Sequence, residues 1–188
     1  MADKYKIIGI KRTTFFNGKR RVGLDTNLLI KLYDNPSLFS YEEARIFNNK
    51  DIIFVHPISL FEFIKYLKGK KLSEEVAKIE ANNFLDSHNL EKVRCFIPDD
   101  EINKFEKECN EKFQQTAKDY LKCHRPDSII LLAFKKCNVN KVISTDESFR
   151  ECANFLGIDG SGLPSLDYTI SRELRRIFDN KRKYRKKK

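Results

Sequence analysis

The stretch that decides the fold is Val22-Gly23-Leu24-Asp25-Thr26-Asn27-Leu28-Leu29-Ile30. Residues 22–24 have a strand pattern that runs up to one acid, and an apolar helical pattern begins just after that acid. Asp25 is therefore expected at the carboxyl end of a strand, where open α/β sheets place their ligand sites. Asp-Thr-Asn before an apolar run is also an ordinary helix cap. Further acids at matching positions would favour a site over a cap.

Strand patterns alternate with helical patterns along the rest of the chain. Further strands are expected at residues 51–55, 93–97 and 141–144, and helices at 28–33, 41–48, 59–67, 73–86, 99–122, 128–136 and 150–156. This alternation is typical of a mostly parallel sheet with helices on both faces. The sequence therefore predicts an α/β fold in which residues 22–164 form one domain.

The two ends of the 188-residue chain carry most of its net charge of +10. Residues 1–21 hold seven basic and one acidic side chain and residues 171–188 hold ten and two, which leaves residues 22–170 with a net charge of −4. Basic ends of this kind bind polyanions by counterion release, although solubilising or disordered tails have the same composition. The sequence predicts a basic N-terminal extension, either a hairpin turning at Asn17-Gly18 or a disordered arm, and a C-terminal helix with a basic tail at 165–188.

Membrane and secreted proteins do not fit this composition. No segment approaches the roughly 18 apolar residues of a membrane span, and the N-terminus lacks the apolar core of a secretory signal. The five cysteines are odd in number and form no Cys-x-x-Cys pair, so neither a disulfide framework nor a zinc knuckle is indicated. A cytoplasmic protein without a membrane partner is predicted.

Four acids occupy comparable places in this pattern. Asp25 and Asp146 each follow a strand. Glu62 and Asp127 each lie in the first turn of an expected helix. Each acid alone has a structural explanation: Glu62 fits a capping box with Ser59, Asp127 fits a helix dipole, and Asp146-Glu147 fit turn and cap residues before Ser148. Because strand ends and helix starts meet at one edge of a parallel sheet, all four carboxylates are expected together, which separate caps do not require.

Carboxylates gathered at one edge repel one another and are individually hard to ionise. A hard divalent cation relieves this repulsion, and ligands that are all oxygen suit Mg²⁺ or Mn²⁺. Asn27 and Thr145 are expected to support the acids by orienting water or carboxylate oxygens. The predicted RNA contacts are one internal cation, Arg150, and four in the tail, Lys181, Arg182, Lys183 and Arg185.

Four motifs, taken in order, resemble those of the PIN-domain nucleases. They are Leu-Asp-Thr-Asn-Leu-Leu-Ile (24–30), Ser-Leu-Phe-Glu (59–62), Arg-Pro-Asp-Ser-Ile-Ile (125–130) and Val-Ile-Ser-Thr-Asp-Glu-Ser-Phe (142–149). The resemblance covers residues 22–158 and implies a parallel sheet between helices. It also implies that four residues are metal-binding catalytic acids, namely Asp25, Glu62, Asp127 and Asp146. The implied reaction is Mg²⁺- or Mn²⁺-dependent hydrolysis of RNA, leaving a 5′-phosphate and a 3′-hydroxyl.

The function predicted from the sequence is that of a metal-dependent endoribonuclease acting on single-stranded or structured RNA. Two alternatives stay open: an RNA- or ribonucleoprotein-binding PIN module without catalysis, and the toxin ribonuclease of a toxin–antitoxin pair. Compared with compact toxin members of the family, the interval from Glu62 to Asp127 is long and the basic ends are additions. An antitoxin-like or ribonucleoprotein partner and a homodimer are left open as well.

Overall fold

The structure is a computed structural model that describes residues 20–35, 51–116 and 118–162. Several expectations fall outside these described residues. They are the N-terminal hairpin, the helix at 41–48, the C-terminal helix, and the basic tail. Within the described part of the chain, no helix has the length and apolar character needed to cross a membrane.

Five parallel strands form one sheet in the described residues. They are β1 (Arg21–Leu24), β2 (Ile52–Val55), β3 (Leu90–Lys92), β4 (Lys141–Ile143) and β5 (Asp159–Ser161). Their order is β3-β2-β1-β4-β5. The strands that follow β1 are therefore added first on one side of it (β2, β3) and then on the other (β4, β5). The predicted α/β fold with a parallel sheet is confirmed. Its switch point lies between β1 and β4, where sheets of this kind open a crevice for ligands.

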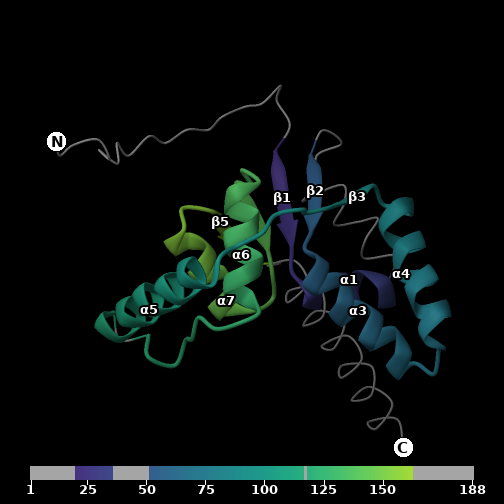
Figure 1. Ribbon diagram of the computed structural model, residues 1–188, viewed down its shortest axis with the longest axis horizontal. Helices are drawn as coiled ribbons and strands as arrows, with labels where there is room; N and C mark the ends of the chain where they lie inside the picture. Colours follow the sequence, from purple (N-terminus) through teal and green to yellow (C-terminus); the bar gives the residue numbers. More distant parts are fainter. Residues whose placement is uncertain (1–19, 36–50, 117, 163–188) are drawn as a thin grey trace, which may run out of the picture.

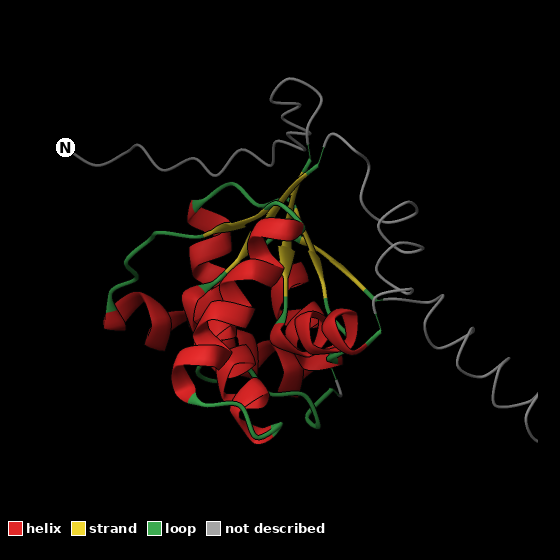
Figure 2. Ribbon diagram, turned by 90° about the vertical axis from the view of Figure 1, so that its right-hand side faces the viewer, coloured by secondary structure: helices red, strands yellow, loops and turns green. Residues whose placement is uncertain are grey.

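Two sets of helices cover the two faces of the sheet. The first set is α1 (Thr26–Asp34), α3 (Pro57–Gly69) and α4 (Glu74–Ser87), and the second is α5 (Asp99–Gln115), α6 (Asp127–Lys136) and α7 (Glu147–Phe155). The two sets stand on opposite sides of β1 and β2 (Figure 1), and Figure 2 shows the strands side by side with helices gathered around them. Ile53 and Val55 pack on the first set, whereas Phe54 packs on the second. Strand residues point alternately to the two faces, so apolar strands fit this layered arrangement.

The central strand depends on a glycine where α6 crosses it. A Cβ atom built on Gly23 would lie 2.5 Å from the ring of Phe134, which is fully buried in α6. Only glycine leaves room for this approach of helix to strand.

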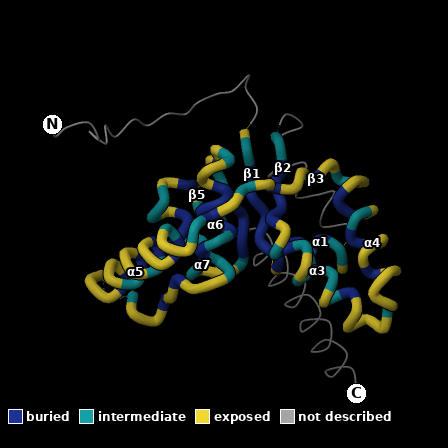
Figure 3. Tube along the Cα trace, in the orientation of Figure 1, coloured by how far each residue is buried: buried dark blue, intermediate teal, exposed yellow. Residues whose placement is uncertain are grey.

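Many of the exposed residues lie on the outer helices, while the strand segments in the middle are buried (Figure 3). Helices that connect parallel strands run back across the sheet, so α6 begins at the edge where β1 ends.

Several element boundaries differ from the prediction. The strand expected at 93–97 is wrong, because pairing with β2 takes place at Leu90–Lys92. The sequence predicts no strand after residue 144, yet β5 lies at Asp159–Ser161, and the helix expected at 99–122 ends at Gln115. The two edge strands are short and carry little apolar pattern, because Leu90 is their one buried residue. Four residues spaced for one face of α5 are buried: Ile102, Phe105, Cys109 and Phe113.

Candidate active site

Asp25 lies where β1 and β4 end side by side. Its backbone N–H donates to the carbonyl oxygen of Ile143 at 3.3 Å, and its Oδ2 accepts a hydrogen bond from Ser144 Oγ at 2.7 Å. The side chain is 6% exposed. Burial raises the pKa of Asp25, the Ser144 hydrogen bond opposes the rise, and the charges of Asp146 and Glu62 add to it. The carboxylate is therefore held at the switch point of the sheet beside other negative charge.

Asp25 caps α1 through its backbone and not through its side chain. Asp25 occupies the N-cap position of α1, and its backbone oxygen accepts from the N–H groups of Leu28 and Leu29. Its side chain makes no capping hydrogen bond. The backbone of Asp25 thus starts the helix, while the carboxylate bonds to Ser144 across the strand ends.

Glu62 is fixed by the residue that follows Asp25. Thr26 is buried, and its Oγ1 donates to Glu62 Oε2 at 2.6 Å. This bond joins α1 to α3. The side chain of Glu62 is therefore oriented toward the end of β1, as expected for an acid of the same site.

The predicted capping box of α3 is wrong. His56 is the N-cap, and its Nδ1 accepts from the N–H of Ile58 at 3.1 Å. Burial lowers the pKa of His56 to about 4, so its ring is neutral and able to accept. Pro57 takes the first helical position, which it favours, so the helix begins before the predicted cap at Ser59. Glu62 consequently lies in the second turn and not in the first.

Asp127 is the first residue of α6 and is half-buried. Burial is the main cause that raises its pKa to about 6, followed by the charge of Asp25. Asp146 and Glu62 raise it further, while His124 opposes them. Asp25 and Asp127 each interact electrostatically with the other three predicted acids, as expected if the acids meet at one edge of the sheet.

Asp146 both caps a helix and faces the other acids. It is the N-cap of α7, where its Oδ1 accepts from the N–H of Phe149 at 3.1 Å. Its own N–H donates to Ser144 Oγ at 2.9 Å. Its charge raises the pKa values of Asp25 and Asp127, so Asp146 caps α7 and also lies near the other acids, while its role as a metal ligand stays a prediction.

Ser144 and Thr26 are the two polar residues that the sequence interpretation missed. The fully buried hydroxyl of Ser144 donates to Asp25 and accepts from the backbone of Asp146, so one side chain links two of the acids. A serine at the end of an apolar strand, two residues before Asp146, was the available signal. In the described part of the chain, neither Asn27 nor Thr145 hydrogen-bonds to these acids, and their supporting role stays a prediction.

Arg150 reaches the same end of β4. Its Nη1 donates to the carbonyl oxygen of Ser144 at 3.0 Å, one turn after Asp146. The guanidinium therefore lies at the edge of the sheet that carries the acids, and its contact with phosphate stays a prediction. The four basic tail residues predicted to bind RNA lie outside the described residues: Lys181, Arg182, Lys183 and Arg185.

The chemistry of the four acids fits a hard divalent cation. Their donors are carboxylate oxygens, which Mg²⁺ and Mn²⁺ prefer. Burial raises the pKa values of Asp25 and Asp127 most, the charges of the neighbouring acids raise them further, and a bound cation would favour the ionised carboxylates. The acids are more widely spaced than a compact ligand set. Within the described residues, the only group of three or more His, Cys, Asp or Glu with ligand atoms all within 4.8 Å consists of cysteines.

Neither a protein-family model nor a curated protein sequence matches the chain. Two solved structures are similar in fold. VapBC-1 from nontypeable Haemophilus influenzae shares 17% identity at a TM-score of 0.49, covering 71% of this chain and 93% of that one. VapBC2 from Rickettsia felis, bound to a DNA fragment from its promoter, shares 14% identity at a TM-score of 0.46, covering 71% and 94%. These likenesses concern the fold alone, so the function is argued from the residues of the site.

Proposed function

We propose that the chain is a Mg²⁺- or Mn²⁺-dependent endoribonuclease whose metal-binding catalytic acids are Asp25, Glu62, Asp127 and Asp146. The observation that carries this proposal is the mutual interaction of four carboxylates from separate segments at the switch point of a parallel sheet. Helix capping does not account for such a group, because only Asp146 uses its side chain as a cap. Repelling charges are retained in proteins where a ligand compensates them, which makes this edge a functional site.

The chain's own residues hold the acids in fixed positions. Ser144 orients Asp25 and Thr26 orients Glu62, each through one short hydrogen bond from a buried hydroxyl. Such bonds present the remaining carboxylate oxygens in a set direction. A bound divalent ion would polarise the scissile phosphate and lower the pKa of a bound water. The proposed phosphate contacts are Arg150 within the domain and the basic tail beyond it.

The alternative is an RNA- or ribonucleoprotein-binding module of the same fold without catalysis. Crowded carboxylates repel a polyanion, so a surface that only binds RNA has no use for them. An antitoxin-like partner would cover the acids and suppress cleavage. This partner stays a prediction. It would be supported if adding such a partner protected the RNA from cleavage.

The test is incubation of the purified chain with a mixed single-stranded RNA pool and Mg²⁺ or Mn²⁺. Asp25→Asn is compared with Asp119→Asn, a matched change at an exposed acid on a turn. We expect metal-dependent cleavage by the wild type and Asp119→Asn, with 5′-phosphates on the products, and a loss of at least about 100-fold for Asp25→Asn. Cleavage by Asp25→Asn at the wild-type rate, or by none of the proteins with either metal, would refute the proposal.

A further inference from the structure

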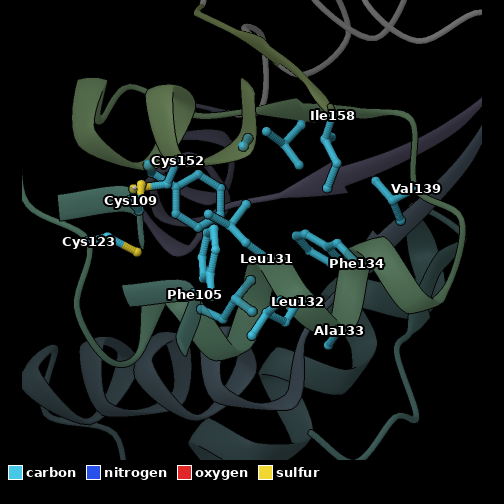
Figure 4. Packing of buried hydrophobic residues seen from close by; sticks show 14 of the residues in the cluster. Phe105, Cys109, Cys123, Leu131, Leu132, Ala133, Phe134, Val139, Cys152 and Ile158 are labelled. Atoms are coloured by element: carbon cyan, nitrogen blue, oxygen red, sulfur yellow. Dashed lines mark hydrogen bonds between the residues drawn. The ribbon is translucent and has the colours of Figure 1, made fainter. Parts of the chain in front are cut away.

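Three cysteine thiols meet in the core on the side of the sheet covered by α5, α6 and α7. Cys109 belongs to α5, Cys123 to the segment before α6, and Cys152 to α7. Their sulfur atoms all lie within 4.8 Å of one another, and those of Cys109 and Cys152 are 3.5 Å apart. Figure 4 shows the sulfur atoms of the three cysteines on one side of the packed core. Each side chain is at most 2% exposed.

The position of Cys123 is fixed by a second set of contacts. Asn110 Nδ2 donates to the carbonyl oxygen of Cys123 at 2.9 Å, and Asn110 Oδ1 accepts from its N–H at 2.8 Å. A residue adjacent to Cys109 in the sequence therefore attaches the backbone of Cys123 to α5. Buried cysteines often act as small apolar residues, but such packing does not require the backbone of the third segment to be held in this way.

The spacing of the sulfurs suits a metal better than a disulfide. Metal–thiolate bonds of about 2.3 Å place the sulfurs of a tetrahedral or trigonal set about 3.8–4.0 Å apart. A disulfide needs a separation of about 2.05 Å, so the sulfurs of Cys109 and Cys152 would have to approach by more than about 1 Å inside a packed core. A metal ion is accommodated by much smaller shifts.

We propose that Cys109, Cys123 and Cys152 form a three-thiolate site for one thiophilic metal ion, Zn²⁺ or Cu⁺. Soft sulfur ligands select these ions over Mg²⁺ and Mn²⁺, so the site is chemically separate from the acids. The bound ion ties α5, α7 and the segment before α6 together. Asp127 and Asp146 begin the two helices next to these ligands, so metal loading stabilises the scaffold of the acidic edge.

The test uses the full chain, purified under reducing conditions, stripped of metal, and titrated anaerobically with Zn²⁺ or with Cu⁺ in separate arms. Bound metal is measured by elemental mass spectrometry after gel filtration, and the alkylation of each cysteine is measured by peptide mass spectrometry. We expect one ion per chain from at least one arm, and the arm that binds more tightly identifies the metal. Alkylation of the three ligands slows at least about tenfold on binding, while that of Cys95 and Cys137 does not change.

Variants separate this site from the acids and from packing effects. Cys109→Ser and Cys109→Ala are expected to lose the bound ion, whereas the matched changes Cys95→Ser and Cys137→Ser keep it. Circular dichroism establishes which variants fold, and the alkylation pattern of the wild type needs no variant. Loss of the RNA cleavage proposed above would not affect these readouts. The proposal would be overturned if neither metal binding nor selective protection were found, or if all five cysteines were protected equally. A Cys109–Cys152 disulfide in the non-reduced protein would also overturn it.

Discussion

Replacing Asp127 by asparagine is expected to stabilise the metal-free protein while abolishing cleavage. The pKa of Asp127 is raised from 3.8 to about 6, mainly by burial. At about 1.36 kcal/mol per pKa unit, this rise corresponds to about 3 kcal/mol of destabilisation by the ionised carboxylate. Because solvent reaches part of the side chain and screens it, we expect about 1–2 kcal/mol in practice. Asparagine keeps the shape of the side chain and removes the charge.

The sign of the effect follows from the folded-state pKa lying above the unfolded one. The unfolded carboxyl ionises at about pH 4 and the folded one at about pH 6, so the penalty of ionisation develops as the pH rises through this window. It is complete above about pH 6 and absent below about pH 4. Asp127→Asn is therefore expected to exceed the wild type in unfolding free energy at pH 7 and to equal it at pH 4.

The assay is urea or thermal unfolding in the presence of EDTA at pH 7 and at pH 4. A gain of about 1–2 kcal/mol corresponds to a Tm increase of about 3–6 °C in a chain of this length. Adding Mn²⁺ is expected to stabilise the wild type and to have a smaller effect on Asp127→Asn, which lacks one proposed ligand. Asp119→Asn, on an exposed turn, is the control and should show no such pH-dependent gain. A variant that is less stable than the wild type at pH 7, or a gain of equal size at pH 4, would refute the reasoning.

Three further perturbations test the scaffold, the orientation of the acids and the basic tail. Gly23→Ala places a methyl group against the ring of Phe134 and should reduce the unfolding free energy by about 2–3 kcal/mol in chemical denaturation, with wild-type stability contradicting the packing. Ser144→Ala removes the donor to Asp25 and should reduce cleavage about 10–100-fold with folding retained, whereas full activity would exclude an orienting role. Deletion of residues 181–188 removes seven basic side chains, so it should weaken RNA binding and reduce the slope of log K against log salt concentration by up to about 5. An unchanged slope, measured in binding assays at several salt concentrations, would show that the tail does not contact RNA.

The central strands were predictable because their local pattern and their final environment agree. The apolar runs around Val22, Ile53 and Val142 are buried on both faces, so the pattern needed no tertiary information. The edge strands were not predictable for the opposite reason. The strand Asp159–Ser161 has no apolar pattern. Gly160 allows α7 to pack close to this strand, because a Cβ atom built on it would lie 2.2 Å from the carbonyl oxygen of Arg150. Such a strand is specified by its neighbours and not by its own residues.

The acids were predictable because their positions follow from topology. A strand end and a helix start share one edge of a parallel sheet whatever the side chains are, so the order of motifs was sufficient to bring Asp25 together with the others. The hydroxyls that hold them depend on register. Ser144 reaches Asp25 only because Leu24 pairs with Ile143, which sets the next residues of the two strands side by side. That pairing joins residues more than a hundred positions apart, and no local spacing records it.

The three buried cysteines show most clearly the difference between a site that local sequence predicts and one that depends on packing. Their spacing in the sequence contains no Cys-x-x-Cys pair and gave no indication of a metal site. Cys109, Cys123 and Cys152 meet only because α5 and α7 pack on the same face of the sheet and Asn110 holds the segment between α5 and α6. Motifs of closely spaced ligands identify sites built within one loop, whereas a site built by packing has no local signature. The three cysteines belong to the second kind, and packing places them in the same half of the molecule that carries Asp127 and Asp146.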